Sequence, residues 1–182
     1  MIDLTKKGLP NAITEADGTP IFLNTDFRLW IRFYEDLRHD GEERDISYLF
    51  RGDAPVIDDY VLSQLLQFLY NHCATPKSEP SSVKTMDYIL DGEYIFSALY
   101  ATYGIDITEI DMHWHKFKAL CDNIITDDTL WGYAKGCRGY TKPSKKDTYE
   151  RQKMRQREAW AFPDELTDEE KKKIEEFEKY FS

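Results

Sequence analysis

The residues with the clearest potential for chemistry lie in the run His113-Trp-His115, which is followed by Cys121. Histidine and cysteine are zinc ligands, and a Cys/His pair can also serve as a nucleophile and its base. On a helix, however, residues two apart point about 200° away from each other, so they cannot both reach one metal ion without a bend. Cys121 falls on an apolar stripe with Trp114 and Phe117, where a thiol packs as a small hydrophobe. We therefore expect packing or surface roles, with no metal, no cofactor and no catalytic residue.

Carboxylate pairs and enzyme motifs lead to the same expectation. Asp58-Asp59 and Asp127-Asp128 occupy predicted helix starts, where negative charge favours the helix dipole. The chain contains no GxxxxGKS or GxxxxGKT, no GxGxxG, no GxSxG and no HExxH. Because each absence removes a common enzyme class, we expect a protein that is not an enzyme.

A second candidate site is the basic, aromatic segment from Trp131 to Arg157. Nine Lys or Arg lie between positions 135 and 157 against Asp147 and Glu150, a net charge of +7 in a chain of net charge -10. Rings interleaved with cations are typical of surfaces that bind single-stranded nucleic acid, but an acidic body disfavours such binding. An acidic protein partner, the protein's own acidic body or plain solvation would account for the same charges.

In the N-terminal third of the chain the sequence predicts a hairpin followed by a helix. Asp17-Gly18 is a turn signal between the short apolar runs 11–14 and 19–23, which indicates a β-hairpin. Two strands are marginal alone, so the hairpin must pack on the body or add to a partner's sheet. Cap candidates at 24–26 begin a helix that ends near 40–41, and its apolar stripe is Phe27, Trp30, Ile31, Tyr34 and Leu37. We expect its other face, with Arg28, Arg32, Glu35 and Asp36, to be a solvated surface.

Further helices are predicted by the spacing of apolar residues in the middle of the chain. One spans 58–73, and the region 86–103 is either one kinked helix or a short element followed by a helix, with Gly104 as its stop. Thr108 and Asp111 form a capping-box-like pair for a helix to about 123. A cap at 126–128 begins a short helix that buries Leu130, Ala134 and Cys137. Short connections favour an antiparallel bundle.

The C-terminal part is polar. Residues 144–160 favour a helix but offer few apolar side chains, so this helix should project. A capping box from Thr167 to Glu170 begins a last helix that carries Ile174, Phe177 and Phe181. We predict a mainly α fold with a hairpin and helical bundle core over 1–142 and a polar helical extension over 143–182.

Composition excludes several classes of protein. Hydrophobic residues at 41% and aromatics at 14% supply enough apolar area for an ordered core. No apolar run approaches the roughly 18–20 residues that span a bilayer, and the first ten residues lack a signal-peptide core, so we expect a cytoplasmic protein. Cys73, Cys121 and Cys137 show no CxxC pairing, and we expect no disulfide framework.

Two motifs resemble the gene-product-fifteen family of long-tailed bacteriophages and prophages. They are Tyr103-Gly-Ile-Asp-Ile107 and His113-Trp-His-Lys-Phe117. The similarity covers residues 21–37 and 91–138, and a weaker similarity covers 153–163. The run Asn24-Thr-Asp-Phe-Arg-Leu-Trp-Ile-Arg-Phe33 also looks like the family's amino-terminal part. His115 stands where the family pattern has an aromatic residue, and residues 131–142 are richer in glycine and aromatics than that pattern. The resemblance supplies no catalytic residue.

The resemblance implies a function through gene order. Members of that family usually lie between the major tail protein and tape-measure genes, the position of tail assembly chaperones, which coat the tape-measure protein and recruit tail-tube subunits in the bacterial host cytoplasm. The alternatives are a structural virion component, such as a tail terminator or neck protein, and a nucleic-acid-binding phage regulator that uses residues 135–157. Self-association stays open, and a membrane partner is not expected. The candidate partner-binding residues are Trp131, Tyr133, Lys135, Arg138, Tyr140, Arg151, Met154, Arg155, Trp160, Phe177 and Phe181.

Overall fold

A computed structural model of the chain describes residues 5, 7–38, 45–70, 83–124, 128–141 and 149–163. Within these ranges the chain forms one two-stranded sheet, a single 3₁₀ turn and six α-helices, so the prediction of a mainly α fold with an N-terminal hairpin is confirmed. The elements are β1 (Ala12–Thr14), β2 (Pro20–Phe22), α1 (Phe27–Asp36), η1 (Ser47–Leu49), α2 (Asp59–Tyr70), α3 (Gly92–Tyr103), α4 (Trp114–Asn123), α5 (Leu130–Arg138) and α6 (Glu150–Ala159).

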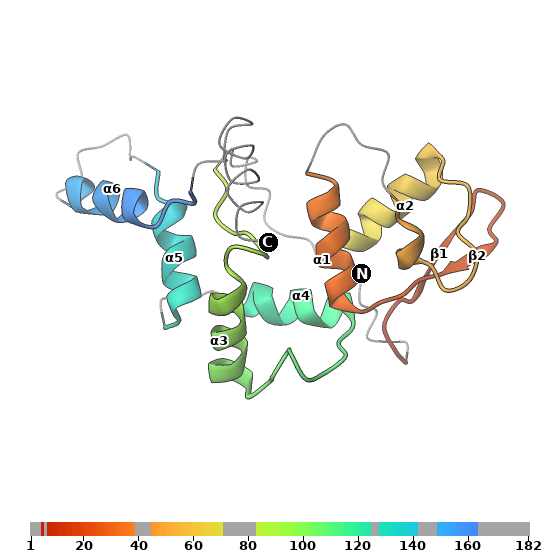
Figure 1. Ribbon diagram of the computed structural model, residues 1–182, viewed down its shortest axis with the longest axis horizontal. Helices are drawn as coiled ribbons and strands as arrows, with labels where there is room; N and C mark the ends of the chain where they lie inside the picture. Colours follow the sequence, from red (N-terminus) through yellow and green to blue (C-terminus); the bar gives the residue numbers. More distant parts are fainter. Residues whose placement is uncertain are drawn as a thin grey trace, which may run out of the picture.

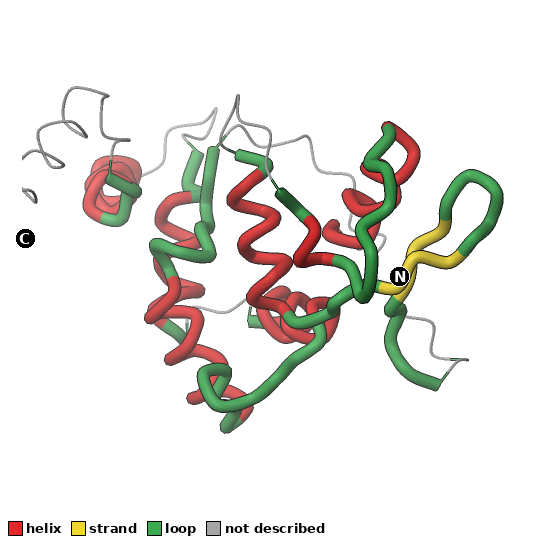
Figure 2. The backbone as a smooth tube through the Cα atoms, turned by 45° about the vertical axis from the view of Figure 1, so that its right-hand side comes forward, coloured by secondary structure: helices red, strands yellow, loops and turns green. Residues whose placement is uncertain are grey.

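The elements follow one another along the long axis of the molecule. The hairpin and α2 lie at one end, α1 and α4 in the middle, α3 and α5 beyond them, and α6 at the other end (Figure 1). Helix α4 lies across the directions of α1, α3 and α5, and Figure 2 shows it almost end-on while the others stay upright. The helices therefore pack with crossed axes as well as side by side, which a simple antiparallel bundle would not show.

The hairpin forms where its turn signal lies. Ile13 pairs with Ile21 across the two strands, and both side chains are buried. Gly18 adopts φ 91°, a conformation that glycine reaches without steric cost. Strand β1 packs against α2, and an isolated bridge joins Leu23 to Phe50. The body of this protein therefore supports the hairpin.

Helix α1 begins where its cap was predicted. The Asp26 carboxylate accepts a hydrogen bond from the Arg28 N–H at 2.9 Å, which satisfies one of the free amides of the first turn. Phe27, Trp30 and Phe33 are its buried face. The helix ends at Asp36, short of the predicted 40–41, and residues 39–44 and 71–82 lie outside the described ranges.

The predicted start of α4 is wrong. The capping-box-like pair of Thr108 and Asp111 caps no helix, because Thr108 instead bonds to the Asp106 carboxylate. The N-cap lies five residues later, at His113, whose ring nitrogen Nδ1 accepts the His115 N–H at 3.0 Å. Of the two alternatives for 86–103, the structure shows a turn followed by a helix, and Gly104 ends that helix with φ 65°.

Helix α5 also differs from its prediction in two details. Its cap is Thr129, whose hydroxyl accepts the Gly132 N–H at 3.0 Å, rather than the carboxylates before it. Leu130 is 61% exposed, whereas its neighbour Trp131 is completely buried beside Ala134. The predicted buried face is therefore confirmed for Ala134 and Cys137 and wrong for Leu130.

Helix α6 buries none of its own residues, as the sparse apolar residues of 144–160 suggested. It lies at the end of the molecule and packs against α5 (Figure 1). Trp160 contacts the rings of Tyr94 and Tyr133, so the C-terminal end of α6 is fixed to the body. The last predicted helix, with Ile174, Phe177 and Phe181, lies outside the described residues.

One apolar core joins the hairpin to α5. Its largest buried side chains are Trp30, Trp114 and Trp131, which come from three different helices. Among the described residues, no helix combines the length and the apolar character that a membrane crossing needs.

Candidate partner-binding groove

The His113-Trp-His115 run holds the C-terminal end of α2. The Trp114 indole N–H donates to the Leu69 carbonyl at 2.8 Å, and His115 Nε2 donates to the Phe68 carbonyl at 2.9 Å. Both carbonyls lie in the last turn of α2 as described, where no N–H of the described helical residues reaches them. The motif therefore supplies side-chain donors to carbonyls at the end of α2 and the N-cap at the start of α4.

The two histidine rings lie closer together than a helical position for both would allow. His113 is the extended N-cap of α4, not a helical residue, and the ring centroids are 5.1 Å apart. Both nitrogens of His113 are engaged, Nδ1 by the His115 N–H and Nε2 by the Pro10 carbonyl at 2.8 Å. Within the described ranges no group of three or more His, Cys, Asp or Glu side chains gathers to hold a metal ion.

The His115 ring is held neutral. Its Nε2–H donates to Phe68, and its buried Nδ1 has no hydrogen-bond partner among the described residues. Burial is the main cause that lowers the pKa of His115 from 6.5 to about 4; the hydrogen bond to the Phe68 carbonyl opposes it in part, and the nearby His113 adds a smaller lowering. Protonation would place an N–H donor at Nδ1, where no described residue supplies an acceptor.

Acidification should therefore weaken the fold before most carboxylates titrate. Because the folded pKa lies below the unfolded one, the stabilisation by neutral His115 is full above pH 6.5 and is lost as the pH falls to about 4. At about 1.4 kcal/mol per pKa unit, the free energy of unfolding should fall by up to about 3 kcal/mol. Urea unfolding followed by circular dichroism at pH 7, 6, 5 and 4 measures this loss. His115→Gln, which keeps a donor for the Phe68 carbonyl, should flatten the profile; an unchanged slope would contradict the assignment.

Cys121 packs in the core beside this motif. Its thiol is buried, and burial raises its pKa to about 12. A thiol of this kind is protonated at neutral pH and unreactive. The structure thus places Cys121 on the apolar stripe that its spacing indicated.

The predicted partner-binding residues fall into three groups. Trp131 and Arg138 are buried, so neither side chain reaches a partner in this conformation. Arg151 and Arg155 are exposed on α6. The half-buried residues are Tyr133, Lys135, Tyr140, Met154 and Trp160, while Phe177 and Phe181 lie outside the described residues.

Internal contacts interrupt the basic segment. Lys135 Nζ lies 4.4 Å from the centroid of the Trp131 ring, and burial lowers the pKa of Lys135. Arg157 donates to the Tyr140 carbonyl at 3.2 Å, and Gln156 donates to the Tyr133 hydroxyl at 2.8 Å. These contacts reduce the number of cations that a nucleic acid could reach.

Arg138 is a clamp between three parts of the chain. Its Nη1 donates to both carboxylate oxygens of Asp91, at 2.9 and 2.8 Å, and its Nε donates to the Trp160 carbonyl at 2.7 Å. Its guanidinium lies 3.8 Å from the centroid of the Phe162 ring. Asp91 is completely buried and also accepts the Asp87 N–H. Arg138 thus ties α5 to the start of α3 and fixes the residues that follow α6.

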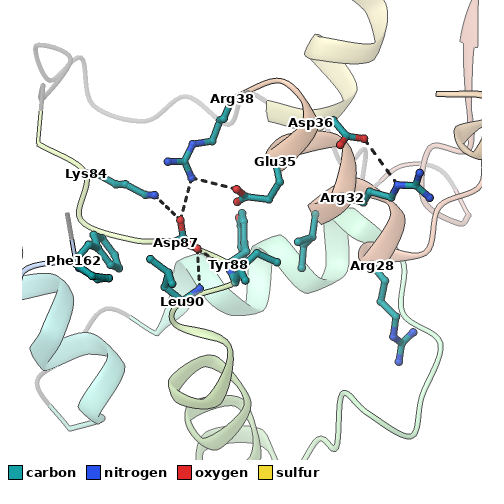
Figure 3. Close-up of a pocket in the computed structure, with 13 residues that line it drawn as sticks. Arg28, Arg32, Glu35, Asp36, Arg38, Lys84, Asp87, Tyr88, Leu90 and Phe162 are labelled. Carbon is teal, nitrogen blue, oxygen red and sulfur yellow. Dashed lines mark hydrogen bonds and ion pairs between the residues drawn. The ribbon is translucent and has the colours of Figure 1, made fainter. Parts of the chain in front are cut away.

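A groove of about 790 Å³ lies between α1, the segment 84–90 and Phe162 (Figure 3). Its apolar lining comes from Ile31, Tyr88, Ile89, Leu90, Phe162 and Pro163. Ile89 is 63% exposed and Leu90 is 53% exposed, although both are large aliphatic residues. An open apolar channel beside a helix is the geometry that accepts an amphipathic helix.

The carboxylates of the groove are engaged within the protein. Asp87 pairs with Arg38 at 3.0 Å and with Lys84, and accepts the backbone N–H groups of Ile89 and Leu90 (Figure 3). Burial alone would raise the pKa of Asp87, but these bonds, led by that from Lys84, hold it well below its usual value. Asp36 accepts the Tyr48 hydroxyl at 2.8 Å, and Glu35 pairs with Arg38.

The cations of the groove are more exposed than its carboxylates. Side-chain exposure is 61% for Arg32, 43% for Arg28 and 36% for Lys84, against 5% for Asp87 and about 20% for Glu35 and Asp36. A ligand that enters the groove would therefore meet apolar side chains and, among the charged groups, mainly these exposed cations, each of which also pairs with a carboxylate of this protein. This arrangement favours a helix with an apolar stripe and acidic flanks.

The sequence did not reveal this groove. Arg28, Arg32, Glu35 and Asp36 were expected to be a solvated face, and they form one wall. Ile89 and Leu90 lie in the turn before α3 and are exposed. Adjacent apolar residues can share a buried helical face, as Phe68 and Leu69 of α2 do, so nothing in the sequence indicated that Ile89 and Leu90 would be exposed.

The sequence matches one family of known proteins. Residues 56–180 match the family described as Bacteriophage Gp15 protein. No curated protein and no solved structure matches the chain. The match covers α2 to α6, including both the Arg138 clamp and the Leu90 side of the groove. Since it spans more than half of the chain, this protein belongs to the bacteriophage Gp15 family.

Proposed function

We propose that this protein is a non-enzymatic tail assembly chaperone that binds a helix of the tape-measure protein in the groove between α1 and the segment 84–90. The observation that carries the proposal is an exposed apolar channel on a protein of a phage family. Large aliphatic residues that lie together on a surface are a feature of protein-binding sites. The polar C-terminal residues or the hairpin would then recruit tail-tube subunits.

The proposal is tested by co-expression of this protein with the tape-measure protein of the same phage. A tagged copy should retain the tape-measure protein on a column and keep it soluble. A phage that lacks the gene should make no normal tails; normal tails would refute the proposal. Mass spectrometry of purified virions separates a chaperone, which should be absent or scarce, from a structural tail or neck protein.

Leu90→Glu should weaken binding of the tape-measure protein at least tenfold. The substitution places a carboxylate where an apolar contact is expected, and loss of a central apolar anchor commonly costs more than about 1.4 kcal/mol of binding free energy. Fluorescence anisotropy with labelled tape-measure fragments measures the change.

Leu130→Glu is the matched control, because Leu130 is exposed to a similar degree and does not line the groove. Binding by this variant should stay within about twofold of the unmodified protein. Equal weakening by both substitutions would place the partner elsewhere.

A further inference from the structure

The groove lies next to the point where the described chain ends. Phe162 and Pro163 are part of its lining, and Lys84 Nζ lies 5.1 Å from the centroid of the Phe162 ring. The Arg138 clamp fixes this end of the groove, because Arg138 holds both the Trp160 carbonyl and the Phe162 ring. Whatever follows Pro163 therefore starts at the mouth of the groove.

The residues that follow have the composition that the groove favours. Residues 164–182 contain eight Asp or Glu against four Lys, a net charge of -4. Leu166, Ile174, Phe177 and Phe181 fall on one side of a helical projection. The exposed cations Arg28, Arg32 and Lys84 border the apolar lining, so the charges of tail and groove are complementary.

A helix formed by the tail would also fit the length of the groove wall. At about 1.5 Å per residue, a helix of the eight residues from Ile174 to Phe181 would extend about 12 Å, and the ten residues of α1 extend about 15 Å. The residues from 164 to 173 are sufficient to bring these anchors alongside α1. An intramolecular ligand of this kind also has a high effective concentration, since its linker is short.

We infer that the groove between α1 and the segment 84–90 binds the C-terminal residues 164–182 of the same chain, with Phe177 and Phe181 as anchors. The tail occupies the groove of the free protein, and its carboxylates face Arg28, Arg32 and Lys84. A partner helix must displace it, and only this last consequence rests on the proposed function. The tail and the partner would thus compete for one surface.

Methyl NMR of the isolated full chain tests the inference. In a sample with labelled Ile and Leu methyl groups and protonated Phe rings, nuclear Overhauser contacts should join Ile89 and Leu90 to Phe177 or Phe181. The double variant Phe177→Ser/Phe181→Ser should shift the Ile89 and Leu90 methyl signals, because the ring currents of the anchors are lost. The control Glu176→Ser/Lys179→Ser changes two residues on the opposite side of the projected helix without a change in net charge, and should leave those signals in place.

Two results would overturn the inference. One is the absence of such contacts together with equal spectra for the Phe double variant and the control. The other is contacts found only between separately labelled copies in a mixed sample, which would make a second copy the occupant. Neither experiment contains a tape-measure protein, so failure here is distinguishable from failure of the proposed function.

Discussion

Replacement of Asp91 by alanine is expected to lower the free energy of unfolding by about 3–5 kcal/mol, because it leaves the buried guanidinium of Arg138 without its counter-ion. Asp91 is completely buried and Arg138 nearly so, and the two are joined by hydrogen bonds of 2.9 and 2.8 Å. The same change removes the acceptor of the Asp87 N–H. Urea unfolding at pH 7, followed by circular dichroism, measures the loss.

Two variants separate the charge from other effects of the substitution. Asp111→Ala removes a fully exposed carboxylate, and its effect should stay below about 1 kcal/mol. The double variant Asp91→Ala/Arg138→Met removes both charges, and it should recover part of the stability lost in Asp91→Ala, because no buried charge is left unpaired. A double variant that is less stable than Asp91→Ala would contradict this account of the pair.

The position of Arg138 could not be predicted from the sequence. The basic segment that contains Arg138 was expected to meet an acidic partner, the protein's own acidic body or solvent, and a local pattern could not choose among these for any one residue. The burial depends on Asp91, which is 47 residues away in sequence, and on the Trp160 carbonyl. A contact of this kind is decided by tertiary packing.

Predictions from short sequence signals are confirmed where the structure depends only on neighbouring residues. The Asp17-Gly18 turn, the Asp26 cap and the Gly104 stop were all predicted, since each depends on the conformation of a few consecutive residues. The start of α4 failed for the opposite reason. Its N-cap is a histidine ring that the Pro10 carbonyl orients from a distant part of the chain, whereas Thr108 and Asp111 satisfied only the local pattern.

The groove combines three segments that are distant in sequence. Its wall comes from α1, its apolar lining from 88–90 and its end from Phe162. In sequence, each segment has the pattern of an ordinary solvent-exposed surface. The apolar channel forms only when the packing of α3 and α5 brings the three segments together. The predicted partner-binding residues, aromatic rings beside cations, lie in a segment where internal contacts engage several of them, and their binding role stays a prediction.

The His113-Trp-His115 run, one of the motifs that resemble the family, has a clear structural role. Trp114 is almost completely buried, packs against Tyr88 and Phe117, and donates to the Leu69 carbonyl. Trp114→Ala should lower the free energy of unfolding by about 5 kcal/mol, because a large core cavity is created and a buried carbonyl loses its donor. Thermal and urea unfolding measure this loss.

Trp131 provides a matched control for the hydrogen bond alone. It is as deeply buried as Trp114, but its indole N–H has no acceptor among the described residues. Trp114→Phe and Trp131→Phe remove a similar volume, yet only the first removes a hydrogen bond that the structure shows, the one to the Leu69 carbonyl. We expect Trp114→Phe to be the more destabilising by about 1–3 kcal/mol. Equal losses would mean that the motif contributes volume only, and that closure of α2 does not depend on the indole donor.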